Sequence, residues 1–268
     1  MKWHDITVGI MGGCLLAQKE IGLNNLFHRR LSARLKTEAG CKARFRFGTY
    51  TGIEDAVQKY LAMTGKGDLD VLLFHVRPQS FLAMTKPVVK YADARGRTRF
   101  SLHPALFNRQ ADWDAALDGC AESATPVPDK PAPLPAFNPI NLLLGKLLRL
   151  DKWACGYLSE FLLHLNEVCK RHGTRLFIVG PSALPASLPG HLNCMHLNRR
   201  IRELAHVHAI PCVGWFTDRD SSGNYLFMDD GLHLNPDGHN FLADRILSSF
   251  LVNLPLESIV PVKHPAAA

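Results

Sequence analysis

The chain has 268 residues, which is enough for one large domain or two small ones with a sizeable core. Its apolar fraction of 47% and charged fraction of 21% are those of an ordinary globular protein. No apolar run approaches the roughly 20 residues of a membrane span, so an integral membrane protein is excluded.

The formal net charge of +7 allows two interpretations. Much of the basic excess lies in two stretches of sequence, 28–47 and 86–100. These residues could form a solvated basic face, or they could attract nucleic acid, anionic lipid or an acidic carrier of substrate. No nucleic-acid recognition motif accompanies the arginines, so we expect no nucleic-acid partner.

The seven cysteines show no CxxC pair and no regular spacing. An odd number of cysteines within apolar patterns favours buried reduced thiols in a cytoplasmic protein over disulfides. "CMH" at 194–196 is too weak to predict a metal site, and no phosphate-binding loop is present, so we expect neither a metal nor a cofactor. "GIMGGC" loosely resembles a lipoprotein cleavage site, but the apolar run before Cys14 is short for a signal.

Strands and helices alternate along the chain. Short apolar runs bounded by glycine or proline predict five strands, at 6–11, 43–47, 70–76, 175–180 and 211–216. Helical periodicity predicts five helices, at 23–35, 54–63, 151–173, 196–208 and 238–251. This alternation predicts parallel βαβ units and a doubly wound α/β fold.

The segment 79–150 breaks this alternation. It is far longer than a crossover requires, and "TPVPDKPAPLPAFNP" can be neither regular helix nor central strand. We expect a single domain over 1–255, with 79–150 inserted after the third strand as a lid or specificity element, and a tail at 256–268.

The carboxyl ends of the first and last core segments carry reactive side chains. The first strand runs into Gly12-Gly13-Cys14, where glycines permit a tight turn and a cysteine could be a nucleophile or a small apolar plug. Far downstream, Asp230 and His233 stand three residues apart, just before a helix. They could form an acid/base pair or could cap the helix. Ligands of doubly wound sheets bind at this edge.

"DGLHLNPDGHNFLADRI" resembles the last signature block of the SGNH/GDSL hydrolase family, and "LNRRIRELAHVHAIPCVGWF" resembles the segment before it. The resemblance covers the α/β core and fails over 79–150. It implies a three-layer α/β/α fold of flavodoxin-like type with a five-stranded parallel sheet. It also implies that His233 is the general base and that Asp230 orients it.

Two other family blocks are altered. The nucleophile block reads Gly12-Gly13-Cys14 in place of Gly-Asp-Ser, and a cysteine would form a thioester intermediate. Gly52 matches the oxyanion-hole glycine, with Gly48 as the fallback. The Gly-x-Asn-Asp block is absent; Gln79 occupies the asparagine position, and Arg77 is a charged alternative donor, or else pairs with an internal acid.

The resemblance therefore implies an acyl-transfer enzyme, thioesterase-like or acyltransferase-like, with a Cys14–His233–Asp230 triad. Gly13, Gly52, Arg77 and Gln79 would bind the oxyanion or substrate. The basic surface makes a carrier-bound or coenzyme-A thioester a candidate substrate. Two alternatives stay open: an ordinary esterase or deacylase, and a catalytically degenerate fold that binds a partner.

Overall fold

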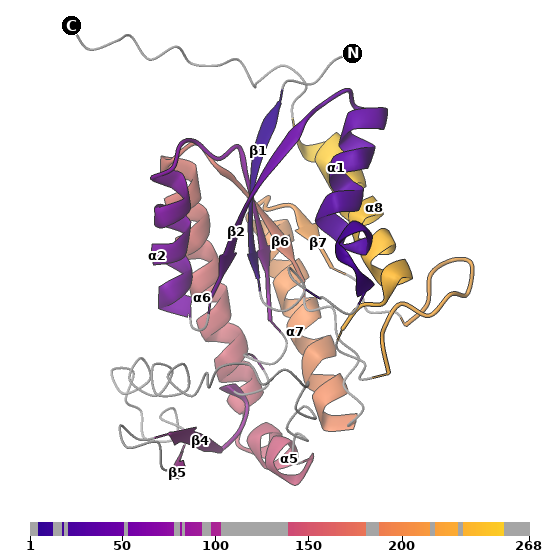
Figure 1. The fold of residues 1–268 in the computed structure, drawn as a ribbon. Helices are drawn as coiled ribbons and strands as arrows, with labels where there is room; N and C mark the ends of the chain where they lie inside the picture. Colours follow the sequence, from indigo (N-terminus) through magenta and orange to yellow (C-terminus); the bar gives the residue numbers. More distant parts are fainter. Residues whose placement is uncertain are drawn as a thin grey trace, which may run out of the picture.

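The computed structural model describes residues 5–12, 18, 21–50, 53–77, 81, 84–92, 98–102, 139–180, 188–214, 218–229 and 233–254. A parallel sheet forms the centre of this structure (Figure 1). Its strands are β1 (Ile6–Gly12), β2 (Ala43–Thr49), β3 (Val71–His75), β6 (Arg175–Val179) and β7 (Cys212–Val213). Their spatial order is β2-β1-β3-β6-β7, and every neighbouring pair is parallel. The predicted five-stranded parallel sheet is confirmed.

Helices cover both faces of the sheet. They are α1 (Phe27–Glu38), α2 (Ile53–Thr64), α6 (Leu150–Arg171), α7 (Leu188–Val207) and α8 (Pro236–Asn253). One face packs against α1 and α8, and the other packs against α2, α6 and α7. The two faces are each lined by buried apolar side chains, and the central strand β3 is buried at all five positions, as its continuous apolar sequence predicts. The three-layer α/β/α architecture is confirmed.

Two helix starts differ from the prediction. The first helix begins at Phe27, because residues Leu23–Asn25 form a 3-10 turn that leaves Leu23 exposed. The fourth begins at Leu188, eight residues before the predicted start. Pro189 and Gly190 look like helix breakers in the sequence, but proline is tolerated in the first turn, where its missing N–H has no intrahelical acceptor.

The insertion contains regular structure that the sequence pattern did not reveal. The strands β4 (Val88–Ala92) and β5 (Thr98–Leu102) pair in antiparallel fashion as a separate two-stranded sheet. The helix α5 (Pro139–Leu147) follows later and is joined to α6 by a short turn in which Arg149 adopts a left-handed conformation, with φ of 59°. Residues 103–138, including the proline-rich stretch, and the predicted tail at 256–268 lie outside the described residues. The single-domain boundary and the lid role stay predictions.

Candidate active site

Most of the predicted site residues come just after the carboxyl ends of the strands in the sequence. β1 ends at Gly12, between β2, which ends at Thr49, and β3, which ends at His75. Gly13, Cys14, Gly52, Gln79 and Asp230 lie outside the described residues, whereas Arg77 and His233 lie inside them.

Arg77 lies at the end of β3 and reaches the end of β2. Its Nη1 donates a hydrogen bond to the carbonyl oxygen of Tyr50 at 2.5 Å, and its guanidinium carbon lies 5.7 Å from the centroid of the Tyr50 ring. Because β1 lies between β2 and β3, this contact passes across the carboxyl end of β1, just where Gly12 leads into the predicted nucleophile. The structure thus puts a positive charge at the carboxyl edge of the sheet.

Tyr50 holds this arginine through its hydroxyl as well. The Tyr50 Oη donates to the carbonyl oxygen of His75 at 2.7 Å and accepts from the backbone N–H of Arg77 at 3.2 Å. Burial raises the pKa of the Tyr50 phenol, so the hydroxyl keeps its proton. Arg77 forms no ion pair with any acid in the described part of the chain, which removes the interpretation that it neutralises an internal carboxylate there.

His75 is buried at the same edge. Burial, and secondarily the charge of Arg77, lowers its pKa to about 4, so the imidazole is neutral at pH 7. Neither ring nitrogen has a hydrogen-bond partner among the described residues. His75 is therefore a packed core histidine, with the added cost of two unsatisfied buried nitrogens.

His233 lies on a loop whose two ends are fixed to each other. The backbone N–H of Met228 donates to the carbonyl oxygen of His233 at 2.8 Å, and Phe227 pairs with Leu234 in an antiparallel bridge. Asn235 N–H donates to the carbonyl oxygen of Leu226 at 3.1 Å. These contacts close the loop that carries the predicted base, so its backbone position is set by hydrogen bonds on both sides.

The cap of α8 is neither Asp230 nor His233. Asn235 is the N-cap: its side-chain oxygen accepts from the N–H of Gly238 at 2.9 Å, and Pro236 follows in the first turn. The Asn235 amide also donates to the carbonyl oxygen of Tyr225 at 2.6 Å. Because Asn235 satisfies the helix end, the capping interpretation no longer accounts for the predicted base and its orienting acid.

A buried polar network connects the His233 loop to the segment that follows β1. Its centre is Gln18, which is 4% exposed. The Gln18 amide nitrogen donates to the carbonyl oxygen of Leu234 at 2.9 Å and lies 2.8 Å from the sulfur of Met228. Its amide oxygen lies 3.1 Å from Nε2 of His239. Two parts of the chain that are more than 200 positions apart are thereby hydrogen-bonded together.

His239 completes this network at the start of α1. Its Nδ1 accepts from the backbone N–H of Phe27 at 3.2 Å, which assigns the ring proton to Nε2 and makes that nitrogen the donor to Gln18. Burial, then the charges of His28, Arg30 and His233, lowers the pKa of His239 to about 3. The imidazole is neutral, and both of its nitrogens are satisfied. His239 lies in the first turn of the last helix, as the predicted range 238–251 requires. Its hydrogen bonds to Phe27 and Gln18 were not predicted.

Part of the predicted basic surface has a structural use. Arg30 and Arg34 of α1 both donate to the side-chain oxygen of Asn240 at 3.2 Å, and Arg34 also forms an ion pair with Asp244. These arginines join α1 to α8. They therefore contribute less to an anion-attracting surface than the sequence suggests.

The cysteines within the described residues are free thiols: Cys41, Cys155, Cys169, Cys194 and Cys212. Burial raises the pKa of four of them to about 11 or 12, so they carry almost no thiolate at neutral pH. The prediction of reduced cysteines is confirmed for these five. In the same part of the chain, no group of three metal-binding side chains is present.

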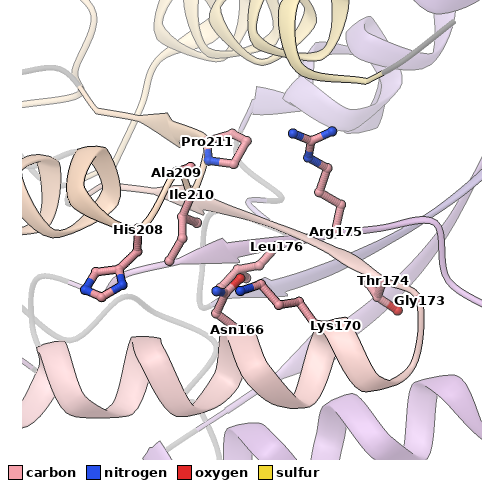
Figure 2. Close-up of a pocket in the computed structure, with 10 residues that line it drawn as sticks. All are labelled: Asn166, Lys170, Gly173, Thr174, Arg175, Leu176, His208, Ala209, Ile210 and Pro211. Carbon is pink, nitrogen blue, oxygen red and sulfur yellow. The ribbon is translucent and has the colours of Figure 1, made fainter.

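A cavity of about 340 Å³ lies at the opposite edge of the sheet (Figure 2). It is bordered by the end of α6, the start of β6 and the turn after α7, with Asn166, Lys170 and His208 among its lining residues. Since the predicted nucleophile and base belong to the carboxyl edge, this cavity is separate from the candidate active site.

The comparisons with known proteins concern the fold. No protein-family model matches the chain, and no curated protein matches its sequence. Among solved structures, TesA superposes with a TM-score of 0.52 at 12% identity, covering 91% of this chain and 97% of that one. A member of the lipolytic protein G-D-S-L family from Veillonella parvula gives 0.53 at 10% identity, covering 92% and 98%. This chain has the SGNH/GDSL hydrolase fold.

A third SGNH/GDSL structure is a catalytic mutant of Axe2, an acetylxylan esterase from Geobacillus stearothermophilus. It superposes with a TM-score of 0.51 at 10% identity, covering 93% of this chain and 96% of that one. The agreement extends over nearly the whole length of both chains. It confirms the three-layer α/β/α fold expected from the last signature block.

Proposed function

We propose that the protein is an acyl-transfer enzyme, thioesterase-like or acyltransferase-like, that forms an acyl-enzyme on Cys14. The triad would be Cys14, His233 and Asp230. One observation carries this proposal: Gln18, which follows Cys14 in the sequence, is hydrogen-bonded both to Leu234, next to the predicted base, and to His239. A cytoplasmic location agrees with the free thiols.

In the first half-reaction, His233 takes the proton of the Cys14 thiol, and the sulfur attacks the carbonyl carbon of an ester or thioester. Asp230 holds the imidazole in the required tautomer and stabilises the imidazolium. The carbonyl oxygen becomes an oxyanion as the tetrahedral intermediate forms. When the intermediate collapses, the leaving alkoxide or thiolate takes the proton from His233 and departs, which leaves a thioester on Cys14.

The oxyanion would be bound by backbone N–H groups at Gly13, Cys14 and Gly52, with Gln79 or Arg77 as the side-chain donor. The position of Arg77 across the end of β1 supports the arginine for this role. In the second half-reaction, His233 activates water or an acceptor, which attacks the thioester and restores the Cys14 thiol. A carrier-bound or coenzyme-A thioester is the substrate that the net positive charge favours.

The deciding experiment measures intact mass after incubation with a panel of acyl thioesters, and separately with iodoacetamide at pH 6.5. We expect one acyl adduct on the wild-type protein, none on Cys14→Ala, and slow formation on His233→Ala. Cys212→Ala is the matched control, because burial raises the pKa of Cys212 to about 11 and the thiol is unreactive at this pH. Adding an amine, an alcohol or a thiol separates transfer from hydrolysis. A Cys14 no more reactive than Cys212 would overturn the proposal and favour a degenerate binding protein.

Arg77→Ala tests the oxyanion assignment. Loss of one preorganised donor lowers the acylation rate by about 100-fold to 1000-fold, and Arg77→Lys should recover only part of it. Arg46→Ala is the control, since Arg46 also hydrogen-bonds carbonyl oxygens, those of Met63 and Gly67, but at the opposite end of the sheet. Equal rates for Arg77→Ala and Arg46→Ala would remove Arg77 from the site.

A further inference from the structure

The helix α5 lies at the same end of the molecule as the candidate active site. α6 leads directly into the amino end of β6, so α6 begins at the carboxyl edge of the sheet. α5 ends just before α6 begins, and it packs against α6 and α7 at that edge (Figure 1). The position of α5 thus determines what the candidate site faces.

α5 presents an apolar face to solvent. Its inner side is defined by Gly145, where any side chain would collide with the backbone of Thr85. The opposite side carries five apolar side chains that are between 47% and 72% exposed: Ile140, Leu143, Leu144, Leu147 and Leu148. Leu192 and Met195 of α7, a helix that α5 contacts, are also exposed. A cluster of this kind marks an interaction site far more often than single exposed leucines do.

Three cations accompany the apolar face: Lys146, Arg149 and Lys152, all of them exposed. None of them forms an ion pair in the described part of the chain, although cations elsewhere do, such as Arg34 with Asp244. The acid of this stretch, Asp151, is buried and contacts His196 at 3.2 Å. The α5 surface therefore has an unbalanced positive charge.

We propose that the α5 surface binds the face of an anionic lipid bilayer, with the helix lying in the interface and the cations meeting lipid phosphates. Aliphatic side chains beside lysine and arginine are the composition of interfacial helices. Lys146, Arg149 and Lys152 supply the charge complementarity that an anionic lipid surface requires. This orientation turns the carboxyl edge of the sheet toward the lipid, and it would apply whatever reaction the site performs.

The test is co-sedimentation of the full-length protein with vesicles of phosphatidylglycerol mixed with phosphatidylcholine, and with phosphatidylcholine alone. We expect binding to the anionic vesicles, decreasing with added salt, and at least ten-fold weaker binding to the neutral ones. Leu143→Ser with Leu147→Ser should lower binding to anionic vesicles by more than ten-fold. Val207→Ser with Val252→Ser is the matched control, since these valines are even more exposed than the two leucines but lie at the ends of α7 and α8.

Charge is tested separately from apolar contact. Lys146→Glu with Lys152→Glu should weaken binding by about five-fold or more per residue, because each cation near an anionic surface contributes about that factor. Lys36→Glu with Lys66→Glu changes the net charge by the same amount at other exposed positions and should have a smaller effect. Thermal melts confirm that each variant is folded.

Three results would overturn the proposal: no binding to anionic vesicles, equal binding by the α5 and control variants, or a dimer in solution that the Leu143/Leu147 double variant dissociates. The last would assign the surface to a second copy of the chain. Because the assay needs no turnover, its result is independent of whether Cys14 forms an acyl-enzyme.

Discussion

Two buried histidines at the carboxyl edge of the sheet are both neutral, but they differ in the hydrogen bonds of their ring nitrogens. His239 has both ring nitrogens hydrogen-bonded, to Phe27 N–H and to Gln18. His75 has no partner for either nitrogen in the described structure. Burial is the main reason why both are neutral, so burial alone does not distinguish them. They differ in hydrogen bonding. A buried imidazole with both nitrogens hydrogen-bonded can hold segments together, whereas one with no hydrogen-bond partner lowers stability.

The largest expected effect comes from breaking the satisfied network. His239→Leu leaves the N–H of Phe27 and the amide oxygen of Gln18 buried without partners, and it should lower the free energy of unfolding by about 2–4 kcal/mol. Urea denaturation measures this.

His75→Leu is the matched comparison. It removes two unsatisfied nitrogens and keeps an apolar side chain in the same place, so the free energy of unfolding should change by less than about 1 kcal/mol, or should rise. Equal losses of unfolding free energy in the two variants would contradict the conclusion that hydrogen bonding distinguishes the two histidines.

Acid should destabilise the protein well before its carboxylates titrate. The folded pKa values of His75 and His239, about 4 and about 3, lie below the unfolded value of 6.5. The unfolded chain therefore binds protons first, so stability is fully present above pH 6.5 and is lost as the pH falls toward 4. At pH 5 the loss is roughly 2 kcal/mol for each of these histidines.

Urea midpoints at pH 7.5, 6 and 5 measure this acid destabilisation. His75→Leu should show a smaller dependence on pH than the wild-type protein, because one of the titrating groups is gone. A variant with an unchanged slope would contradict the assignment of His75 as a neutral buried group.

A smaller loss of stability than that of His239→Leu is expected at the helix that follows His233. Asn235→Ala removes the N-cap of α8 and the amide bond to Tyr225, which should cost about 1–2 kcal/mol of stability. Asn253→Ala is a suitable control, since Asn253 donates to the carbonyl oxygen of Ser249 at the other end of the same helix. A similar loss for both would mean that the Asn235 cap does not anchor the loop.

The elements of the core were predictable because their signals are local. β1 and β3 are continuous apolar runs, as buried parallel strands should be, and α6 ends in Lys170, Arg171 and Gly173, as a helix terminus should. The pair of β4 and β5 was missed because its strands have five residues each, carry one basic residue each, and lie in a basic stretch of sequence. Such a pattern looks like a basic loop when no neighbouring element is known.

The contacts within the candidate site were not predictable from the sequence. The Gln18–His239 bond and the Arg77–Tyr50 contact each join residues from separate segments of the chain, so no local pattern contains them. The cue for Arg77 was only its position after β3, and the cue for Tyr50 was its position after β2. The motif around His233 was visible because one short block contains both the base and its helix.

The packing of α1 against α8 has a consequence for biosynthesis. Phe27, Leu31 and Leu35 belong to the same buried cluster as Leu242, Ile246 and Phe250. α8, the helix that covers α1, is synthesised only after all five strands of the sheet. Until then, the apolar side of α1 and one face of β1 lack the cover of α8, and contacts so distant in sequence form slowly. A nascent chain of this protein should therefore need protection by chaperones until α8 has been released.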